Sequence, residues 1–338
     1  MTSITLAVAG TDTEQGKLFL EKLAAAEDLE ITELYPLEKV PDEYDAVRFR
    51  GRNHLKQKLD DFDFSQVQAA IFFSSPANSR VPMLAALEAG CHVIDATDGT
   101  PLADSLMVIS EVNGADMADV STRLYVSPAA AVVSAVLALK EISDAYGIES
   151  LNITAFESVS NSGHEAVKEL AGQAVSLLNG RPATPRKFPA QVAFNIIPSA
   201  IENPRDQQYS AHELNVVGEI ENFMPALTGR VTFSSFTMPV FYGYCAHMTF
   251  RTSMPASCQE LTNLLESSSL NEYLTSEHVT PVTHGVDRAR QALTRLRPGT
   301  GTEGDFNLYA VLDNTTAGGA LNCVGMVKRI AENLTQIG

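Results

Sequence analysis

Short apolar segments alternate with segments of helical spacing over the first third of the chain, and this alternation limits the folds that the chain can adopt. The apolar runs are residues 3–9, 69–73, 91–95 and 123–126. Leucines spaced along residues 18–23 indicate a helix, and residues 82–88 indicate another, with Pro82 in its first turn. Buried strands that alternate with helices are typical of a parallel sheet covered on both faces. We therefore predict an α/β fold in which residues 1–126 form a doubly wound, Rossmann-like domain of the dinucleotide-binding type.

The rest of the chain shows longer strands and a less regular order. Ser127 is expected to cap a helix over residues 129–146, with Pro128 at its first position. A helical stripe follows, formed by Val167, Leu170, Ala171, Ala174 and Leu178. The predicted strands are residues 151–157, 231–241, 247–252 and 308–312. We predict an α+β domain over residues 127–316, and a terminal helix within residues 317–338 that completes the first domain.

The charge of the chain argues against several classes of partner. The sequence has 41 acidic and 24 basic residues, and its formal net charge is −17. Such a surface repels nucleic acids and anionic membranes, so we expect neither as a partner. The first residues lack the basic start of a signal peptide, and no apolar run is long enough to span a bilayer. The four cysteines have no metal-ligand spacing, so the sequence predicts no metal site and a cytoplasmic protein with reduced thiols.

Several segments resemble, in the same order, segments of aspartate-semialdehyde dehydrogenase. They are GCHVID (90–95), SEVN (110–113), FPAQVAFNIIP (188–198), MPVFYG (238–243), and DN (313–314) with GGA (318–320). The resemblance is closest to the Usg-type paralogue of that family, which lacks the catalytic cysteine. It implies a dinucleotide-binding domain, a catalytic and dimerisation domain of the semialdehyde dehydrogenase type, and a homodimer. It also implies the family's reaction, the reductive dephosphorylation of an aspartyl phosphate with NADPH.

The two groups that carry the family's chemistry are replaced in this chain. The position of the catalytic cysteine holds Ala130, and alanine cannot form a thioester. The position of the general-base histidine holds Tyr244, and a phenol with a pKa near ~10 is a poor proton shuttle at neutral pH. Cys245 is not expected to replace the nucleophile, because a lone cysteine usually behaves as a small buried hydrophobe. His247 is not expected to replace the base, because a residue three positions along a strand points to the opposite face.

The positions that hold the substrate anions in the family are also changed. The arginine that binds the substrate carboxylate corresponds to Thr237, and a lysine that assists it falls near Asn215. The phosphate-binding arginine falls on Pro101, and the serine beside it on Asp98. The glutamine that orients the substrate corresponds to Glu157. Neither threonine nor proline can offer the two-pronged hydrogen bonding of a guanidinium, and the added carboxylates repel phosphate.

The dinucleotide loop is altered as well. Gly10 and Gly16 match the first and last glycines of the family loop, but the middle glycine corresponds to Thr13. Two carboxylates, Asp12 and Glu14, flank that threonine. A side chain at the middle position hinders the approach of the backbone to a pyrophosphate, and the carboxylates oppose its charge. The sequence therefore predicts no cofactor firmly, and NADP would be the cofactor if this loop still binds one.

Three kinds of function remain open. The chain is a non-catalytic paralogue that binds a partner or a small metabolite, or it is an NADP-dependent aspartate-semialdehyde dehydrogenase of amino-acid biosynthesis. The third alternative is an enzyme with different chemistry in a cleft lined by Tyr244, Cys245, Glu157 and Ser160. Fold alone does not decide among them. We favour the first, because the nucleophile, the base, the carboxylate arginine and the central loop glycine all differ at once.

Overall fold

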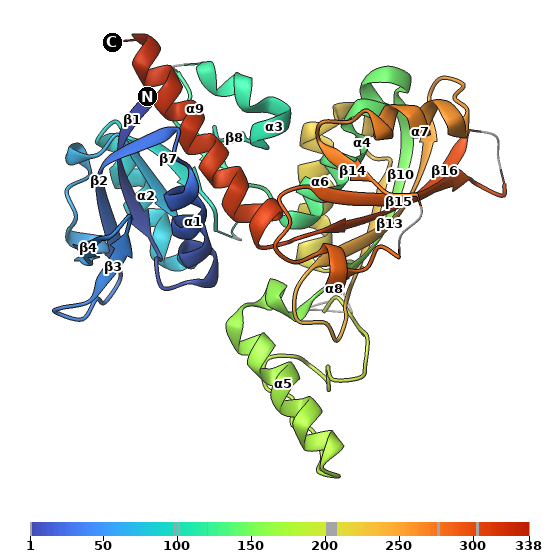
Figure 1. Ribbon diagram of the computed structural model, residues 1–338, viewed down its shortest axis with the longest axis horizontal. Coiled ribbons are helices and arrows are strands. Elements are labelled where there is room, and N and C mark those ends of the chain that lie inside the picture. The colour runs from blue at the N-terminus through green and yellow to red at the C-terminus, as the bar shows by residue number, and fades with distance from the viewer. Residues whose placement is uncertain are drawn as a thin grey trace. The chain divides into compact units, whose positions relative to one another are not determined.

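The computed structural model describes residues 2–97, 99, 102–119, 121–200, 208–275, 278–301 and 304–337 (Figure 1). The chain divides into two compact units, one made of Met1–Ala129 with Gly319–Gly338 and the other of Ala130–Gly318. Each unit is built around its own seven-stranded sheet. No helix within the described ranges is long and apolar enough to cross a membrane.

The sheet of the first unit is parallel throughout, with the strand order β5-β2-β1-β6-β7-β9-β8. Its strands are β1 (Thr2–Ala9), β2 (Leu29–Glu38), β5 (Gln57–Lys58), β6 (Ala69–Phe72), β7 (His92–Asp95), β8 (Leu106–Met107) and β9 (Leu124–Val126). The helices of this unit are α1 (Glu14–Ala25), α2 (Pro76–Glu88), α3 (Ser110–Asn113) and α9 (Leu321–Ile337). A separate antiparallel hairpin, β3 (Ala46–Phe49) and β4 (Arg52–Leu55), follows β2.

Helices cover both faces of this parallel sheet. Alternate residues of β1 divide between two cores, because successive side chains of a strand point to opposite faces. Leu6 and Val8 pack in the core that includes the buried residues of α1 and α9, whereas Ala7 and Ala9 pack in the core that includes α2. The predicted doubly wound α/β fold is therefore confirmed.

Helix α2 begins earlier than the sequence indicated. It spans Pro76–Glu88, so Pro76 occupies the first turn and Pro82 lies inside the helix. The prediction that Pro82 starts the helix was wrong, because residues 77–80 are small or polar and show no apolar periodicity.

The sheet of the second unit is mixed, with the strand order β11-β12-β10-β13-β16-β15-β14. Its strands are β10 (Ile148–Glu157), β11 (Ile197–Pro198), β12 (Val231–Thr237), β13 (Tyr244–Thr252), β14 (Asn271–Tyr273), β15 (Gln291–Pro298) and β16 (Asp305–Leu312). The helices are α4 (Ala130–Tyr146), α5 (His164–Leu178), α6 (Ala211–Phe223), α7 (Cys258–Glu266) and α8 (Pro281–His284). Strands β10 and β12 run parallel, whereas β10, β13, β16 and β15 form successive antiparallel pairs. The predicted α+β architecture of this half is confirmed.

Helix α4 is the central helix of the second unit. Every residue from Ala131 to Leu139 is buried. Two side chains of the sheet donate hydrogen bonds to its backbone: Asn271 Nδ2 of the edge strand β14 to Leu137 O at 2.7 Å, and Gln291 Nε2 of β15 to Ser134 O at 3.1 Å. These contacts fix the position of the helix and of its N-terminal residue, Ala130.

Three predicted boundaries around this helix and the central strands were wrong. Helix α4 begins at Ala130, so Pro128 does not occupy its first position. The Ser127 hydroxyl accepts a hydrogen bond from Asn322 Nδ2 at 3.0 Å. Strand β12 ends at Thr237 instead of continuing to residue 241, because Pro239 follows and lacks a backbone donor for a strand ladder. Strand β13 begins at Tyr244, three residues before the predicted start.

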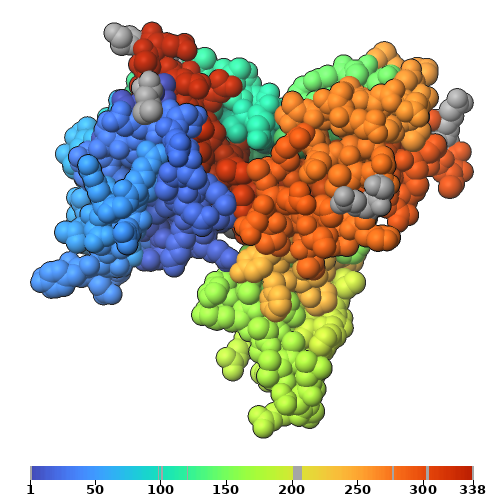
Figure 2. All heavy atoms as spheres, viewed as in Figure 1, coloured from blue at the N-terminus to red at the C-terminus, as the bar shows by residue number. Residues whose placement is uncertain are grey.

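Helix α5 buries part of the predicted stripe, since Leu170 is in the core and Val167 and Ala174 pack against it. Ala166, Leu170 and Gln173 are its buried residues, whereas Ala171 and Leu178 are exposed. The buried residues belong to a core that includes Val192 of a loop and Ile197 of β11, and the periodicity of the helix alone did not reveal this packing. In Figure 2 the yellow-green segment that contains α5 stands out from the rest of the second unit.

Candidate functional site

Three positions that the resemblance singled out lie in one row across the second sheet. Glu157 ends β10 and pairs with Thr237 at the end of β12 on one side and with Tyr244 at the start of β13 on the other. Directly opposed residues of neighbouring strands point to the same face of a sheet. The side chains of Thr237, Glu157 and Tyr244 are therefore neighbours, and we call them the strand-end row.

Ala130 lies close to the same end of the sheet. It is the first residue of α4 and is half-buried. A Cβ atom placed on Gly318 would come within 2.7 Å of the Ala130 Cβ and within 3.1 Å of a Leu312 methyl carbon. Leu312 is the partner of Tyr244 in the β13–β16 pair. The N-terminus of α4 thus approaches the strand-end row, but a methyl group is all that it presents there.

The Tyr244 hydroxyl is buried in the second unit. Tyr244 is 3% exposed, and its hydroxyl oxygen has no hydrogen-bond partner among the described residues. Burial raises the pKa of this phenol well above its usual value, and the negative charge of Glu157 raises it further. The phenol is therefore neutral at physiological pH and cannot take up a proton as a histidine would.

Glu157 is held by two donors, one of which the sequence did not reveal. The carboxylate is 8% exposed. His212 Nε2 lies 2.7 Å from Glu157 Oε1, and Asn161 Nδ2 donates to Glu157 Oε2 at 2.9 Å. His212 lies in the first turn of α6, three residues before Asn215, which is exposed. The capping box of Ser210 and Glu213 is a sequence signal for the start of this helix, and it places His212 one position inside it.

Asn314 and Ser160 support the start of β13. Asn314 Oδ1 accepts a hydrogen bond from the backbone of Gly243 at 2.9 Å, and Asn314 Nδ2 donates to Ser160 Oγ at 3.1 Å. Gly243 has a φ of +96°, and a Cβ there would meet the Pro281 carbonyl oxygen at 3.0 Å. Ser160, predicted to line a cleft, is buried and belongs to this network next to Tyr244.

Cys91, Cys245 and Cys323 lack the surroundings of an activated nucleophile. Burial raises the pKa of Cys245, which lies next to Tyr244 on β13 but on the opposite face. Burial also raises the pKa of Cys91 to about 11 and that of Cys323 to about 12. A reactive cysteine requires a lowered pKa and access to solvent. His247 lies on the same face as Cys245, away from the strand-end row.

In the first unit, the loop between β1 and α1 makes its hydrogen bonds within the protein. Glu38 Oε1 accepts from the backbone of Asp12 at 2.9 Å and from the Thr11 hydroxyl at 2.8 Å. Thr13 caps α1: its hydroxyl accepts from the backbone of Gly16 at 3.0 Å and donates to Gly10 O at 2.7 Å. The Glu38 carboxylate thus accepts a hydrogen bond from a backbone N–H of the kind that a dinucleotide loop donates to a pyrophosphate.

The two glycines of this loop have structural reasons of their own. Gly10 has a φ of +83°, and a Cβ there would lie 2.6 Å from the backbone nitrogen of Ser74. A Cβ on Gly16 would lie 2.2 Å from Gly10 O. Close packing of the loop against β6 and α1 therefore explains both glycines without a bound ligand.

A lysine beside the loop is neutralised by two carboxylates. Lys56 Nζ lies 2.8 Å from Asp12 Oδ1 and also contacts Asp45, and the Lys56 side chain is 4% exposed. Burial opposes the charge of Lys56, but the hydrogen bonds with Asp12 and Asp45 outweigh it and raise the pKa. These residues line a cavity of about 530 Å³. The residues present do not fit an anionic dinucleotide, since Glu38 and Asp12 occupy the donors that would hold its phosphates.

Two of the remaining predicted positions are not described by the structure. Asp98 and Pro101 lie outside the described residues. Thr237 is half-buried in the strand-end row. Among the residues that the structure describes, no group of three or more histidine, cysteine, aspartate or glutamate side chains could hold a metal ion.

Comparison with known proteins finds relatives that are similar to this chain over both of its units. Residues 139–317 match the family model described as semialdehyde dehydrogenase, dimerisation domain. Aspartate-semialdehyde dehydrogenase of Shewanella violacea is 32% identical over 94% of this chain and 94% of its own. The USG-1 protein homolog of Azotobacter vinelandii is 28% identical over 96% of this chain and 97% of its own. The crystal structure of aspartate semialdehyde dehydrogenase II of Vibrio cholerae, complexed with ASA, has a TM-score of 0.91 and 31% identity and covers 99% of each chain.

Proposed function

We propose that this chain, which belongs to the aspartate-semialdehyde dehydrogenase family, acts by binding a ligand. In this proposal it does not catalyse the family's phosphorylating dehydrogenase reaction. Its ligand in this proposal is a small metabolite or a protein partner. The similarity to a USG-1 protein homolog agrees with the proposal, because the resemblance noted in the sequence was to a paralogue without the catalytic cysteine.

The observation that carries the proposal is the pair Ala130 and Tyr244. Ala130 stands at the N-terminus of α4, where the resemblance expects a thiolate, and burial raises the pKa of Cys91, Cys245 and Cys323. Tyr244 stands where the resemblance expects the base, and its phenol stays neutral. Without a nucleophile and a base, the acyl-enzyme route has neither its covalent step nor its proton transfer.

Weak or absent NADP binding is part of the same proposal. Enzymes of this family use NADPH in general, but here the Glu38 carboxylate already accepts from the loop backbone. A dinucleotide phosphate would have to displace that carboxylate and approach Asp12 as well, against the repulsion of both charges. The strand-end row is then the more suitable place for a ligand, since it holds a buried carboxylate and a hydroxyl that has no hydrogen-bond partner among the described residues.

We further propose a cytoplasmic homodimer formed through the second unit. That unit matches a dimerisation domain, and closed two-fold pairing is the commonest form of self-association. The net charge of −17 disfavours nucleic acids and anionic membranes as partners.

The test is a direct assay of the purified protein with aspartate semialdehyde, phosphate and NADP. We expect NADPH to form only at the background rate, while the Shewanella violacea relative, assayed in parallel, serves as the positive control. Protein-dependent NADPH formation that persists through repurification would overturn the proposal. Thermal-shift measurements with aspartate semialdehyde alone would test binding separately from turnover.

A further inference from the structure

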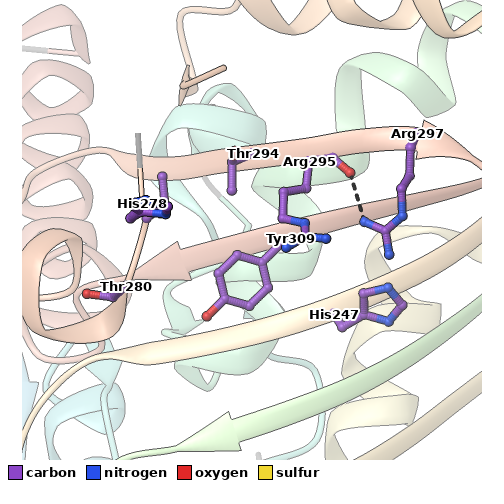
Figure 3. A pocket seen from close by; sticks show the side chains of 8 residues that line it. His247, His278, Thr280, Thr294, Arg295, Arg297 and Tyr309 are labelled. Carbon is purple, nitrogen blue, oxygen red and sulfur yellow. Dashed lines mark hydrogen bonds between the residues drawn. The ribbon is translucent and has the colours of Figure 1, made fainter. Parts of the chain in front are cut away.

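A second cavity, of about 380 Å³, lies in the second unit, away from the strand-end row. His247 of β13, Thr294, Arg295 and Arg297 of β15, and Tyr309 of β16 line it, together with His278 from a loop. Figure 3 shows the side chains of Arg295, Arg297 and Tyr309 on the same side of the sheet as the imidazole of His247. His247 is directly opposite Tyr309 in the β13–β16 pair, so both belong to the face that Tyr244 does not use.

The cavity is basic in a strongly acidic protein. Acidic residues outnumber basic ones by 41 to 24, yet neither Arg295 nor Arg297 forms an ion pair with any described residue. The one hydrogen bond between them runs from Arg297 Nη1 to the backbone oxygen of Arg295 at 3.3 Å, which leaves most guanidinium donors unused (Figure 3). Guanidinium groups bind carboxylates and phosphates through paired hydrogen bonds.

A β-bulge brings the arginines to this face. Thr294 pairs with Tyr309, but the next pair is Arg297 with Asn307, so β15 has one more residue than β16 in this interval. In a regular strand Thr294 and Arg297, three residues apart, would point to opposite faces. Because of the extra residue they point to the same face, as Tyr309 and Asn307 do. Bulges commonly redirect a side chain next to a functional site.

The bulge also places Arg295 in a strained conformation. Its φ is +58°, in the left-handed region that favours glycine. Arg50 has a similar φ of +43°, but its guanidinium donates to the carbonyl oxygens of Leu23, Ala26 and Leu29 at the end of α1. The Arg295 guanidinium has no such partners among the described residues, so the fold does not explain why an arginine stands there. Strain of this kind is commonly found at binding sites.

The charges of the two arginines affect the pKa of His247, which lines the cavity. Burial lowers the pKa of His247, and the charges of Arg297 and Arg295 lower it further. The imidazole is thus mainly neutral at pH 7 and can donate one hydrogen bond to a ligand.

We propose that this cavity binds a small oxyanion, a ligand that carries phosphate or carboxylate groups, with Arg295 and Arg297 as the recognising residues. Its volume lies within the range of about 300–1,000 Å³ that is usual for small-molecule sites. The inference goes beyond the proposed function and is independent of it, because none of the lining residues belongs to the strand-end row.

Titration calorimetry with pyrophosphate and with citrate, at constant ionic strength against sodium chloride, tests the site. We expect saturable binding of at least one of these anions at one site per chain. The double variant Arg295→Gln/Arg297→Gln should bind at least about tenfold more weakly, since hydrogen bonds to charged groups are the strong ones. The matched control is Arg181→Gln/Arg186→Gln, which removes the same charge from exposed positions of the same unit and should bind as the unchanged protein does.

A third variant separates binding from folding. Arg295→Gly relieves the left-handed strain, so its melting temperature should stay equal or rise while anion affinity falls. Equal affinity in the double variant and in its control, or no saturable binding of either anion, would overturn the proposal. A double variant that loses dimer mass in light scattering, with unchanged anion affinity, would also overturn it and would assign the arginines to a contact between subunits.

Discussion

Replacing Tyr244 by phenylalanine should stabilise the second unit. The substitution removes a hydroxyl that is buried, has no hydrogen-bond partner among the described residues, and lies near the charge of Glu157. A buried polar group without a partner costs about 1–3 kcal/mol, so Tyr244→Phe should raise the free energy of unfolding by up to that amount. For a domain of this size each kcal/mol corresponds to roughly 2–4 °C, which gives a rise in melting temperature of roughly 2–12 °C.

The assay is thermal and urea unfolding of the two proteins, with Tyr125→Phe as the matched control. Tyr125 is also fully buried, but its hydroxyl donates to Thr122 O at 2.8 Å, so the same substitution should there cost about 1 kcal/mol. Opposite signs for the two substitutions are the expected result. If Tyr244→Phe destabilises the protein as much as Tyr125→Phe, then the Tyr244 hydroxyl has a partner in the folded protein, and the argument that it is kept for a ligand fails.

Four further predictions concern the nucleophile position, the loop, the subunit contact and pH. Ala130→Cys should be alkylated faster than an ordinary cysteine, because it begins α4, but should show no dehydrogenase turnover; robust turnover would contradict the proposed loss of function. Glu38→Gln should increase NADP affinity in calorimetry, and an unchanged lack of binding would show that Glu38 is not what blocks the loop. Light scattering at micromolar concentration should give twice the chain mass of 36.4 kDa, whereas a monomer would refute the dimer. Burial and Arg123 lower the pKa of His92 below its usual 6.5, so below that pH the unfolded chain binds more protons than the folded chain. The free energy of unfolding should therefore be fully retained above pH 6.5 and decrease as the pH falls, and the decrease should be smaller in His92→Gln.

The parallel sheet covered on both faces was accessible from the sequence because it depends on local patterns. Runs such as residues 69–73 are apolar on both faces and are bounded by polar or small residues, which is typical of strands covered on two sides. The strand-end row was accessible in a different way, since resemblance to one family identified Thr237, Glu157 and Tyr244 before the strands that align them were known.

Contacts between distant segments were not accessible. His212 and Glu157 are 55 residues apart, and nothing local to either residue indicates that the first turn of α6 reaches the end of β10. The Glu38 carboxylate lies 26 residues from the backbone donor that it binds. The bulge at Arg295 carries neither glycine nor proline, the residues that usually mark such an irregularity in a sequence. Each of these features depends on tertiary packing, which periodicity does not encode.

The position of α9 has a consequence for how the chain is made. Val324, Val327 and Ile330 of α9 belong to the same core as Leu6 and Val8 of β1, although they are translated after the whole of the second unit. At about 5–20 residues per second, synthesis of the intervening Ala130–Gly318 takes roughly 10–40 s, and during that time one face of the first sheet lacks its covering helix. The second unit is continuous in sequence and can complete its core first. The nascent chain therefore exposes an apolar sheet face until α9 has been translated, and this is the interval in which a chaperone that recognises apolar surface would bind it.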